Sequence, residues 1–155
     1  MPNHPPAPRP SALFVAEPPA QWHIRAPLVV DCSVLVSYLF EEHDAVEAAA
    51  ALRGRKLHAP ALLPFEFANV ARSKSRAGGP ALRVHAALEA FESMSVELHA
   101  VSVIELHELA LRYALSAYDA AYLWLAGALK APLATFDQRL GAAAAIYLPT
   151  LGSSP

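Results

Sequence analysis

Residues 28–40 read LVVDCSVLVSYLF, and this stretch decides the fold class. Residues 28–30 form a short apolar run rich in β-branched side chains, which predicts a buried strand. Asp31 ends that run, and residues 34–40 continue with the pattern of a helix. The stretch therefore predicts a strand followed at once by a helix.

The rest of the chain repeats this alternation. Further strands are predicted at residues 57–59, 96–101, 133–136 and 146–148. Helices are predicted at residues 45–53, from 61 or 64 to 76, and at 81–93, 102–113, 116–130 and 138–145. Parallel strands need a crossover connection that is usually helical, so the alternation predicts an α/β fold, a single domain with a central parallel sheet flanked by helices.

Composition limits the class of protein. The chain has 155 residues, the length of one domain, and 55% of them are hydrophobic, which excludes a disordered chain. The single cysteine, Cys32, excludes a disulfide framework. The net charge of −2 argues against nucleic-acid binding through bulk positive charge, although a local site remains compatible with it.

The prolines mark a boundary, because eight of the 14 lie in the first 27 residues. We predict a Pro-rich disordered leader at residues 1–26, the folded domain at 27–150 and a short tail at 151–155. The leader lacks the apolar stretch of a secretory signal, and the apolar run at 120–129 is too short to span a bilayer. We expect a cytoplasmic protein that does not cross a membrane.

Four acidic residues are candidates for a functional site. Ligands of open parallel sheets bind beyond the carboxyl ends of the strands, where the next helices begin. Each acid also has a purely structural explanation, as a helix cap or as an anion in a first helical turn. Helix starts on a parallel sheet face one edge, so capping itself would bring the four together. They are Asp31, Glu66, Asp119 and Asp137.

Carboxylates that converge repel one another unless a cation neutralises them. A divalent ion is the simplest counter-charge, and all-oxygen ligands favour Mg²⁺ or Mn²⁺. Zinc is disfavoured, because the seven histidines are scattered with none paired at i+3 or i+4, and Cys32 has no partner.

Four motifs around these acids resemble those of the PIN-domain family, and within it most closely those of the VapC-type toxins of bacterial toxin–antitoxin pairs. The resemblance extends over residues 28–148, and all four acidic positions are filled. The motifs are VVDCSVL at 29–35, PFEFAN at 64–69, SAYDAAYL at 116–123 and ATFDQRL at 134–140.

The resemblance implies a metal-dependent endoribonuclease that cleaves RNA, is held inactive by a cognate antitoxin and is often a homodimer. The four acids would be catalytic and would hold one or two Mg²⁺ or Mn²⁺ ions, with a metal-bound water attacking the phosphorus. Ser33 would orient Asp31 or a metal-bound water. Asn69, on the same helix face as Glu66, would steady that carboxylate or contact a phosphate, and Arg139 would contact a phosphate.

Two kinds of surface would serve substrate and partner. The basic segments 53–56 and 72–76 are candidates for attracting RNA. An antitoxin segment would lie in an apolar groove, unless its residues are core. The groove candidates are Leu35, Tyr38, Leu39, Phe65 and Phe67.

Other functional classes remain as alternatives. A receiver-like signalling domain is also α/β with acids at strand ends, but it needs a lysine ending a late strand, and Lys130 precedes its strand instead. A haloacid-dehalogenase-like phosphatase needs a second carboxylate where this chain has Ser33. If the four acids only cap separate helices, the protein is a non-catalytic interaction domain.

Overall fold

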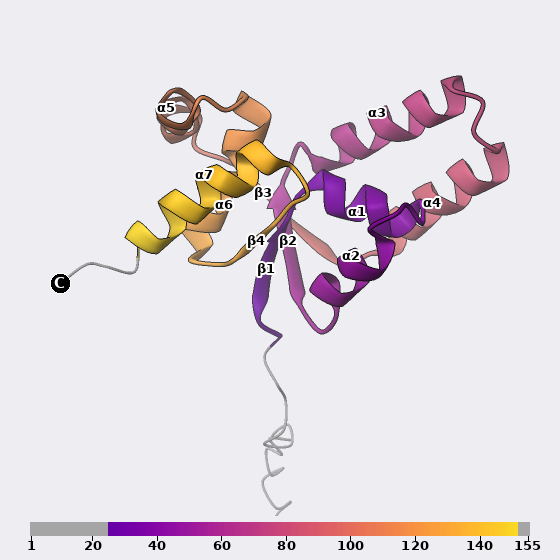
Figure 1. Ribbon diagram of the computed structural model, residues 1–155, viewed down its shortest axis with the longest axis horizontal. Helices are drawn as coiled ribbons and strands as arrows, with labels where there is room; N and C mark the ends of the chain where they lie inside the picture. The colour runs from indigo at the N-terminus through magenta and orange to yellow at the C-terminus, as the bar shows by residue number, and fades with distance from the viewer. Residues whose placement is uncertain (1–24, 152–155) are drawn as a thin grey trace, which may run out of the picture.

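The computed structural model describes residues 25–151, and a four-stranded parallel sheet in the order β3-β2-β1-β4 forms its centre (Figure 1). The residues of β1 from Leu28 to Val30 are all buried, because helices cover both faces of the sheet. The strands are β1 (Pro27–Val30), β2 (Lys56–Pro60), β3 (Val96–His99) and β4 (Leu133–Ala134).

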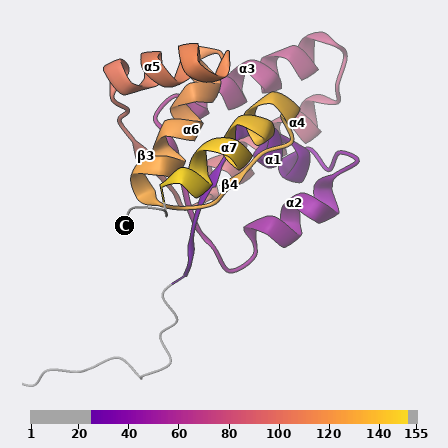
Figure 2. The same cartoon turned by 60° about the vertical axis from the view of Figure 1, so that its left-hand side comes forward.

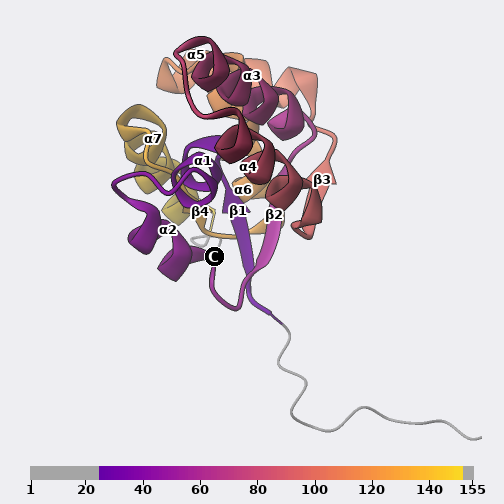
Figure 3. The ribbon, with the colours of Figure 1, turned by 90° about the vertical axis from the view of Figure 1, so that its right-hand side faces the viewer.

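Seven helices within the described residues form two layers around the sheet. Helices α1 to α4 lie on one side, which faces the viewer in Figure 3, and α5 to α7 lie on the other, which Figure 2 brings forward. Helix α6 packs directly on β1 and β2, and α5 and α7 pack against α6. The helices are α1 (Cys32–Leu39), α2 (Ala45–Leu52), α3 (Leu63–Arg76), α4 (Ala81–Ser93), α5 (Val103–Tyr113), α6 (Ala117–Leu129) and α7 (Gln138–Thr150).

The predicted α/β class, with a parallel sheet flanked by helices, is confirmed. The strand predicted at residues 146–148 is wrong, because α7 continues through it. Helical geometry brings Tyr147 against Gly127 of α6, so closely that a Cβ at Gly127 would lie 2.8 Å from the Tyr147 ring. Packing between helices therefore outweighs the strand preference of Ile, Tyr and Leu in this segment.

The predicted leader and tail lie almost wholly outside the described residues, so these two domain boundaries stay predictions. Among residues 25–151, no helix is long and apolar enough to cross a membrane.

Candidate functional site

One pocket of about 390 Å³ is lined by all four acids that the sequence singles out. Asp31 directly follows β1, and Asp137 comes three residues after β4. Glu66 belongs to the first turn of α3 and Asp119 to the first turn of α6. The pocket thus lies at the carboxyl edge of the sheet, where helices from both layers begin.

Helix caps occur at the same positions where the acidic residues meet in one pocket. The Asp31 side chain caps α1, and the Asp137 carboxylate caps α7 by accepting a hydrogen bond from the backbone N–H of Leu140 at 2.8 Å. Ser116 caps α6, where its hydroxyl oxygen accepts from the N–H of Asp119 at 3.1 Å. The structural explanation of these acids is therefore correct and does not compete with a shared site.

A small network of hydroxyl groups holds Asp31. The hydroxyls of Ser33 and Thr135 both donate to Asp31 Oδ2, at 2.6 and 2.9 Å. The two hydroxyl oxygens in turn accept from the backbone N–H groups of Phe136 and Asp137, at 3.0 and 2.9 Å. The network joins the end of β1 to the loop after β4. Thr135 was not among the residues predicted to take part in the site.

Two further carboxylates are held in a similar way. The Tyr122 hydroxyl donates to Glu66 Oε2 at 2.5 Å, and the Ser116 hydroxyl donates to Asp119 Oδ2 at 2.7 Å. All four carboxylates thus use one oxygen to accept from the protein. Within residues 25–151, no hydrogen bond or ion pair reaches the other oxygen of any of them. Four oxygens are left for a ligand.

The charges in this pocket act on one another. Burial raises the pKa of Glu66, the Tyr122 hydroxyl opposes this, and the charges of Asp31 and Asp119 raise the pKa further. Burial, followed by the charges of Glu66 and Asp31, raises the pKa of Cys32 to about 12. The pocket therefore favours any bound cation, and Cys32 stays a protonated thiol.

Three more polar residues of this pocket were not predicted. Glu42 and Asp44 line it, and their sequence signal is the acidic segment 41–44 after α1. Glu42 forms an ion pair with Lys74. Ser37 also lines the pocket, and its buried hydroxyl has no hydrogen-bond partner among the described residues. This oxygen-rich donor set with an unpartnered hydroxyl fits a hydrated Mg²⁺ or Mn²⁺ ion, which keeps several waters.

Of the supporting residues predicted from the sequence, only one lines the acidic pocket. Ser33 lines the pocket, whereas Asn69 is exposed and lines a neighbouring groove with Lys74. The Arg139 guanidinium donates to the Ala114 carbonyl at 2.9 Å, in the connection between α5 and α6. Neither Asn69 nor Arg139 lines the acidic pocket.

The predictions of the basic and apolar surfaces are partly wrong. Residues 53–55 precede β2 and Lys56 begins it, so this segment lies at the opposite edge of the sheet from the pocket, because β1 and β2 are parallel. Leu35 and Phe67 are fully buried in the core and cannot line a groove. Tyr38 and Phe65 remain available, with exposed fractions of 40% and 74%.

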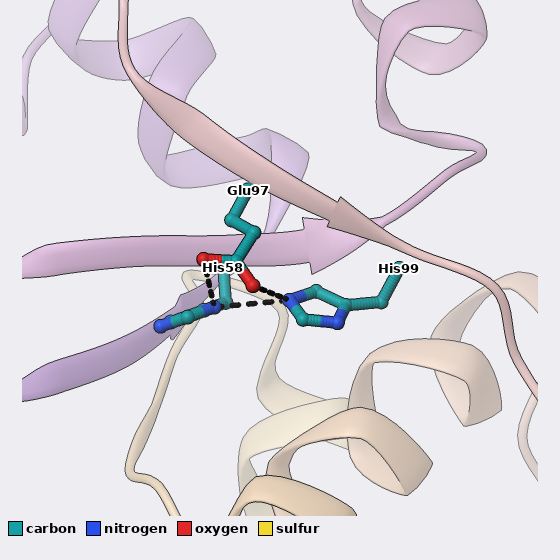
Figure 4. Close-up of side chains that lie close together, drawn as sticks. All are labelled: His58, Glu97 and His99. Carbon is teal, nitrogen blue, oxygen red and sulfur yellow. Dashed lines mark hydrogen bonds and ion pairs between the residues drawn. The ribbon is translucent and has the colours of Figure 1, made fainter.

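A second cluster combines His58 of β2 with Glu97 and His99 of β3 (Figure 4). One potential ligand atom from each of the three lies within 4.8 Å of the others. Burial lowers the pKa of His58, and the Glu97 charge opposes this shift. The expectation of scattered histidines is wrong here, because it considered helical spacings only, whereas these residues meet across two neighbouring strands.

Comparison with known proteins agrees with the fold. A PIN domain family model matches residues 28–146. No curated protein matches the chain. The crystal structure of PAE2754 from Pyrobaculum aerophilum is similar, with a TM-score of 0.61 and 21% identity over 83% of this chain and 97% of that chain. At this identity the likeness supports the fold alone.

Glu66→Gln is expected to stabilise the metal-free protein at pH 7. The raised pKa of Glu66 means that the folded state binds its proton more tightly, so stability falls as the pH rises through that pKa. The neutral amide avoids this loss and still offers an oxygen to Tyr122. Urea denaturation in the presence of a chelator measures the gain, which should vanish at about pH 3.5, below the ordinary pKa of a glutamate.

The matched control is Glu92→Gln, which changes an exposed glutamate of α4 and should leave the free energy of unfolding within about 0.5 kcal/mol of wild type. A loss of stability in Glu66→Gln at pH 7 would contradict the electrostatic description of the pocket.

Proposed function

This chain belongs to the PIN domain family, and we propose that it is a divalent-metal-dependent endoribonuclease. PIN domains are generally metal-dependent nucleases. The observation that carries the proposal is the common pocket of four carboxylates, each of which keeps one oxygen free of partners among residues 25–151. Oxygen ligands in this number suit Mg²⁺ or Mn²⁺.

The four acids would hold the ion, and each has a partner that keeps it in place. An ion bound there supplies positive charge for the phosphate and lowers the pKa of a bound water. Ser33 and Thr135 fix the orientation of Asp31 through Oδ2. Tyr122 donates to Glu66 and so favours its ionised form, which is the form that binds a cation.

The RNA backbone is proposed to approach along the groove that contains Asn69 and Lys74. This groove and the acidic pocket share Val36, Glu42 and Val70 in their walls, so the two are continuous. Lys74 forms an ion pair with Glu42 where the groove meets the acidic pocket. An RNA phosphate could replace Glu42 as the partner of the Lys74 ammonium group. Arg139, two residues from Asp137, is a second candidate for a phosphate contact.

We further propose the role of a VapC-type toxin that forms a homodimer and is inhibited by a cognate antitoxin. The motifs around the four acids support this assignment. Phe65 directly precedes Glu66 and is 74% exposed, so its ring is available for an apolar contact. Phe65 is therefore the proposed contact for an apolar antitoxin segment near the pocket. Tyr38, the other exposed candidate, lines a separate groove with Arg53 and Arg55.

A receiver-like domain fits the sheet less well. Receiver-type sheets have the strand order 2-1-3-4-5, whereas here β1 lies between β2 and β4. A non-catalytic interaction domain remains the alternative function, and the cleavage experiment decides between the two.

The purified protein should cleave RNA with Mg²⁺ or Mn²⁺ and stop when a chelator is added, leaving 5′-phosphate and 3′-hydroxyl ends. Asp31→Asn and Asp119→Asn should each lower the cleavage rate at least about 100-fold, because each removes a charged ligand. Glu92→Gln is the matched control and should cleave like wild type. Undiminished cleavage by the Asp31→Asn/Asp119→Asn double variant would refute the mechanism, and no cleavage by wild type would favour the non-catalytic alternative.

Thr135→Val should lower the cleavage rate by about 10- to 100-fold and raise the Mg²⁺ concentration needed for half-maximal activity. The substitution keeps the side-chain shape but removes the hydroxyl that joins Asp31 to Asp137. Thr135→Ser restores the hydroxyl and should recover most of the activity. Equal Mg²⁺ dependence in wild type and Thr135→Val would mean that Thr135 does not position the ligands.

Production of the protein in bacterial cells should arrest growth if it is a toxin. Asp31→Asn/Asp119→Asn should not arrest growth at equal protein levels. Co-production of the protein encoded by the neighbouring reading frame should restore growth to cells making the wild type, and Phe65→Asp should weaken that rescue. Normal growth of cells that make active wild-type nuclease would reject the toxin role while leaving the nuclease proposal intact.

A further inference from the structure

We propose that His58, Glu97 and His99 form a second metal site, separate from the acidic pocket, that binds one zinc-type divalent ion. The three residues lie on β2 and β3, the outer strand pair of the sheet (Figure 4). None of them lines the acidic pocket. The proposal is therefore independent of the nuclease function.

Strand register brings the three side chains to one face. His58 pairs with Glu97 across the two parallel strands, and His99 follows Glu97 by two residues. Side chains on a strand alternate between faces, so residues 97 and 99 point the same way, and His58 points with its partner. Backbone pairing therefore places all three side chains on the same face of the sheet.

The distances suit a tetrahedral ion. His58 Nδ1 and His99 Nε2 are 3.0 Å apart. Glu97 Oε2 lies 3.9 Å from His58 Nδ1, and Glu97 Oε1 lies 3.6 Å from His99 Nε2. Ligands about 2.0–2.1 Å from a tetrahedral zinc are separated by about 3.4 Å. The two ring nitrogens are closer together than this value, and each lies within 3.9 Å of one Glu97 oxygen. With one ligand atom from each residue all within 4.8 Å of one another, an ion could enter once the rings move apart and one Glu97 oxygen turns toward both.

Burial and neighbouring side chains restrict the positions of the three proposed ligands. His58 is only 5% exposed, which restricts its ring, and the two ring nitrogens already share a hydrogen bond whose proton an ion would replace. Lys56 Nζ lies 2.7 Å from Glu97 Oε2 and orients the carboxylate, as a neighbour of a metal ligand commonly does.

The donor chemistry separates this site from the acidic pocket. Two imidazoles and one carboxylate are a zinc-type ligand set, which leaves the fourth position for water, whereas oxygen-only ligands suit Mg²⁺ or Mn²⁺. β3 is an edge strand that, among the described strands, pairs only with β2, so a bound ion would cross-link these two strands. The cross-link would lie close to the connection from β2 to α3, where the Ala61 N–H donates to the His99 carbonyl at 2.8 Å.

The test is a zinc titration of the untagged full chain against a chromophoric chelator, in excess Mg²⁺. Wild type should bind one Zn²⁺ at this site, and Co²⁺ at the same site should give the visible absorption of a four-coordinate ion. Glu97→Gln and His99→Gln should each lower zinc affinity at least about 100-fold, because each removes a direct ligand. Circular dichroism of the metal-free variants checks folding, and the exposed Glu97 offers a variant that leaves the core untouched.

Three controls identify the site. His107→Gln, at an exposed histidine of α5, and His4→Gln/His23→Gln, outside the described residues, should keep wild-type affinity. Asp31→Asn/Asp119→Asn should keep it too, although it abolishes the acidic site. The proposal is overturned if wild type binds no zinc, or if Glu97→Gln and His99→Gln retain wild-type affinity, whatever the controls show.

Discussion

The hydrogen bond from the Asp31 N–H to the Ala134 carbonyl, 3.0 Å long, is the contact on which the acidic pocket depends. It is the last link between β1 and β4, and it sets the start of α1 beside the loop that leads to α7. Thr135 can then bond both to Asp31 and to the backbone of Asp137. Because α3 and α6 begin at the same edge, Glu66 and Asp119 complete the pocket from opposite layers of the molecule.

The short distances between the carboxylates of the acidic pocket also oppose folding, because like charges repel one another. Burial and the charges of Asp31 and Asp119 raise the pKa of Glu66, so the pocket disfavours the ionised form of this carboxyl. The protein reduces the repulsion with hydrogen bonds from Ser33, Ser116 and Tyr122, but these reach only one oxygen of each carboxylate. A pocket arranged in this way gains most from a cation, so the cost in stability and the proposed activity have one cause.

Two kinds of metal chemistry are proposed for one sheet, and strand position distinguishes them. At the ends of β1 and β4 the donors are carboxylates attached to helix starts. On β2 and β3 the donors are side chains that project from paired strand residues, His58 beside Glu97. The hard ion and the zinc-type ion would therefore act at different places, one at the proposed reaction centre and the other at an edge strand.

The sequence by itself determined the α/β class, the four acids and their caps, because these follow from local signals: a β-branched strand, a capping residue and the next helix. It did not reveal that residues 146–148 are helical, since that depends on Tyr147 packing against Gly127. Nor did it reveal Thr135, Tyr122 or the His58 cluster, whose partners lie 41 to 104 residues away along the chain. Only the tertiary structure decided these contacts, because strand order and register bring distant residues together and no local pattern encodes which strands become neighbours.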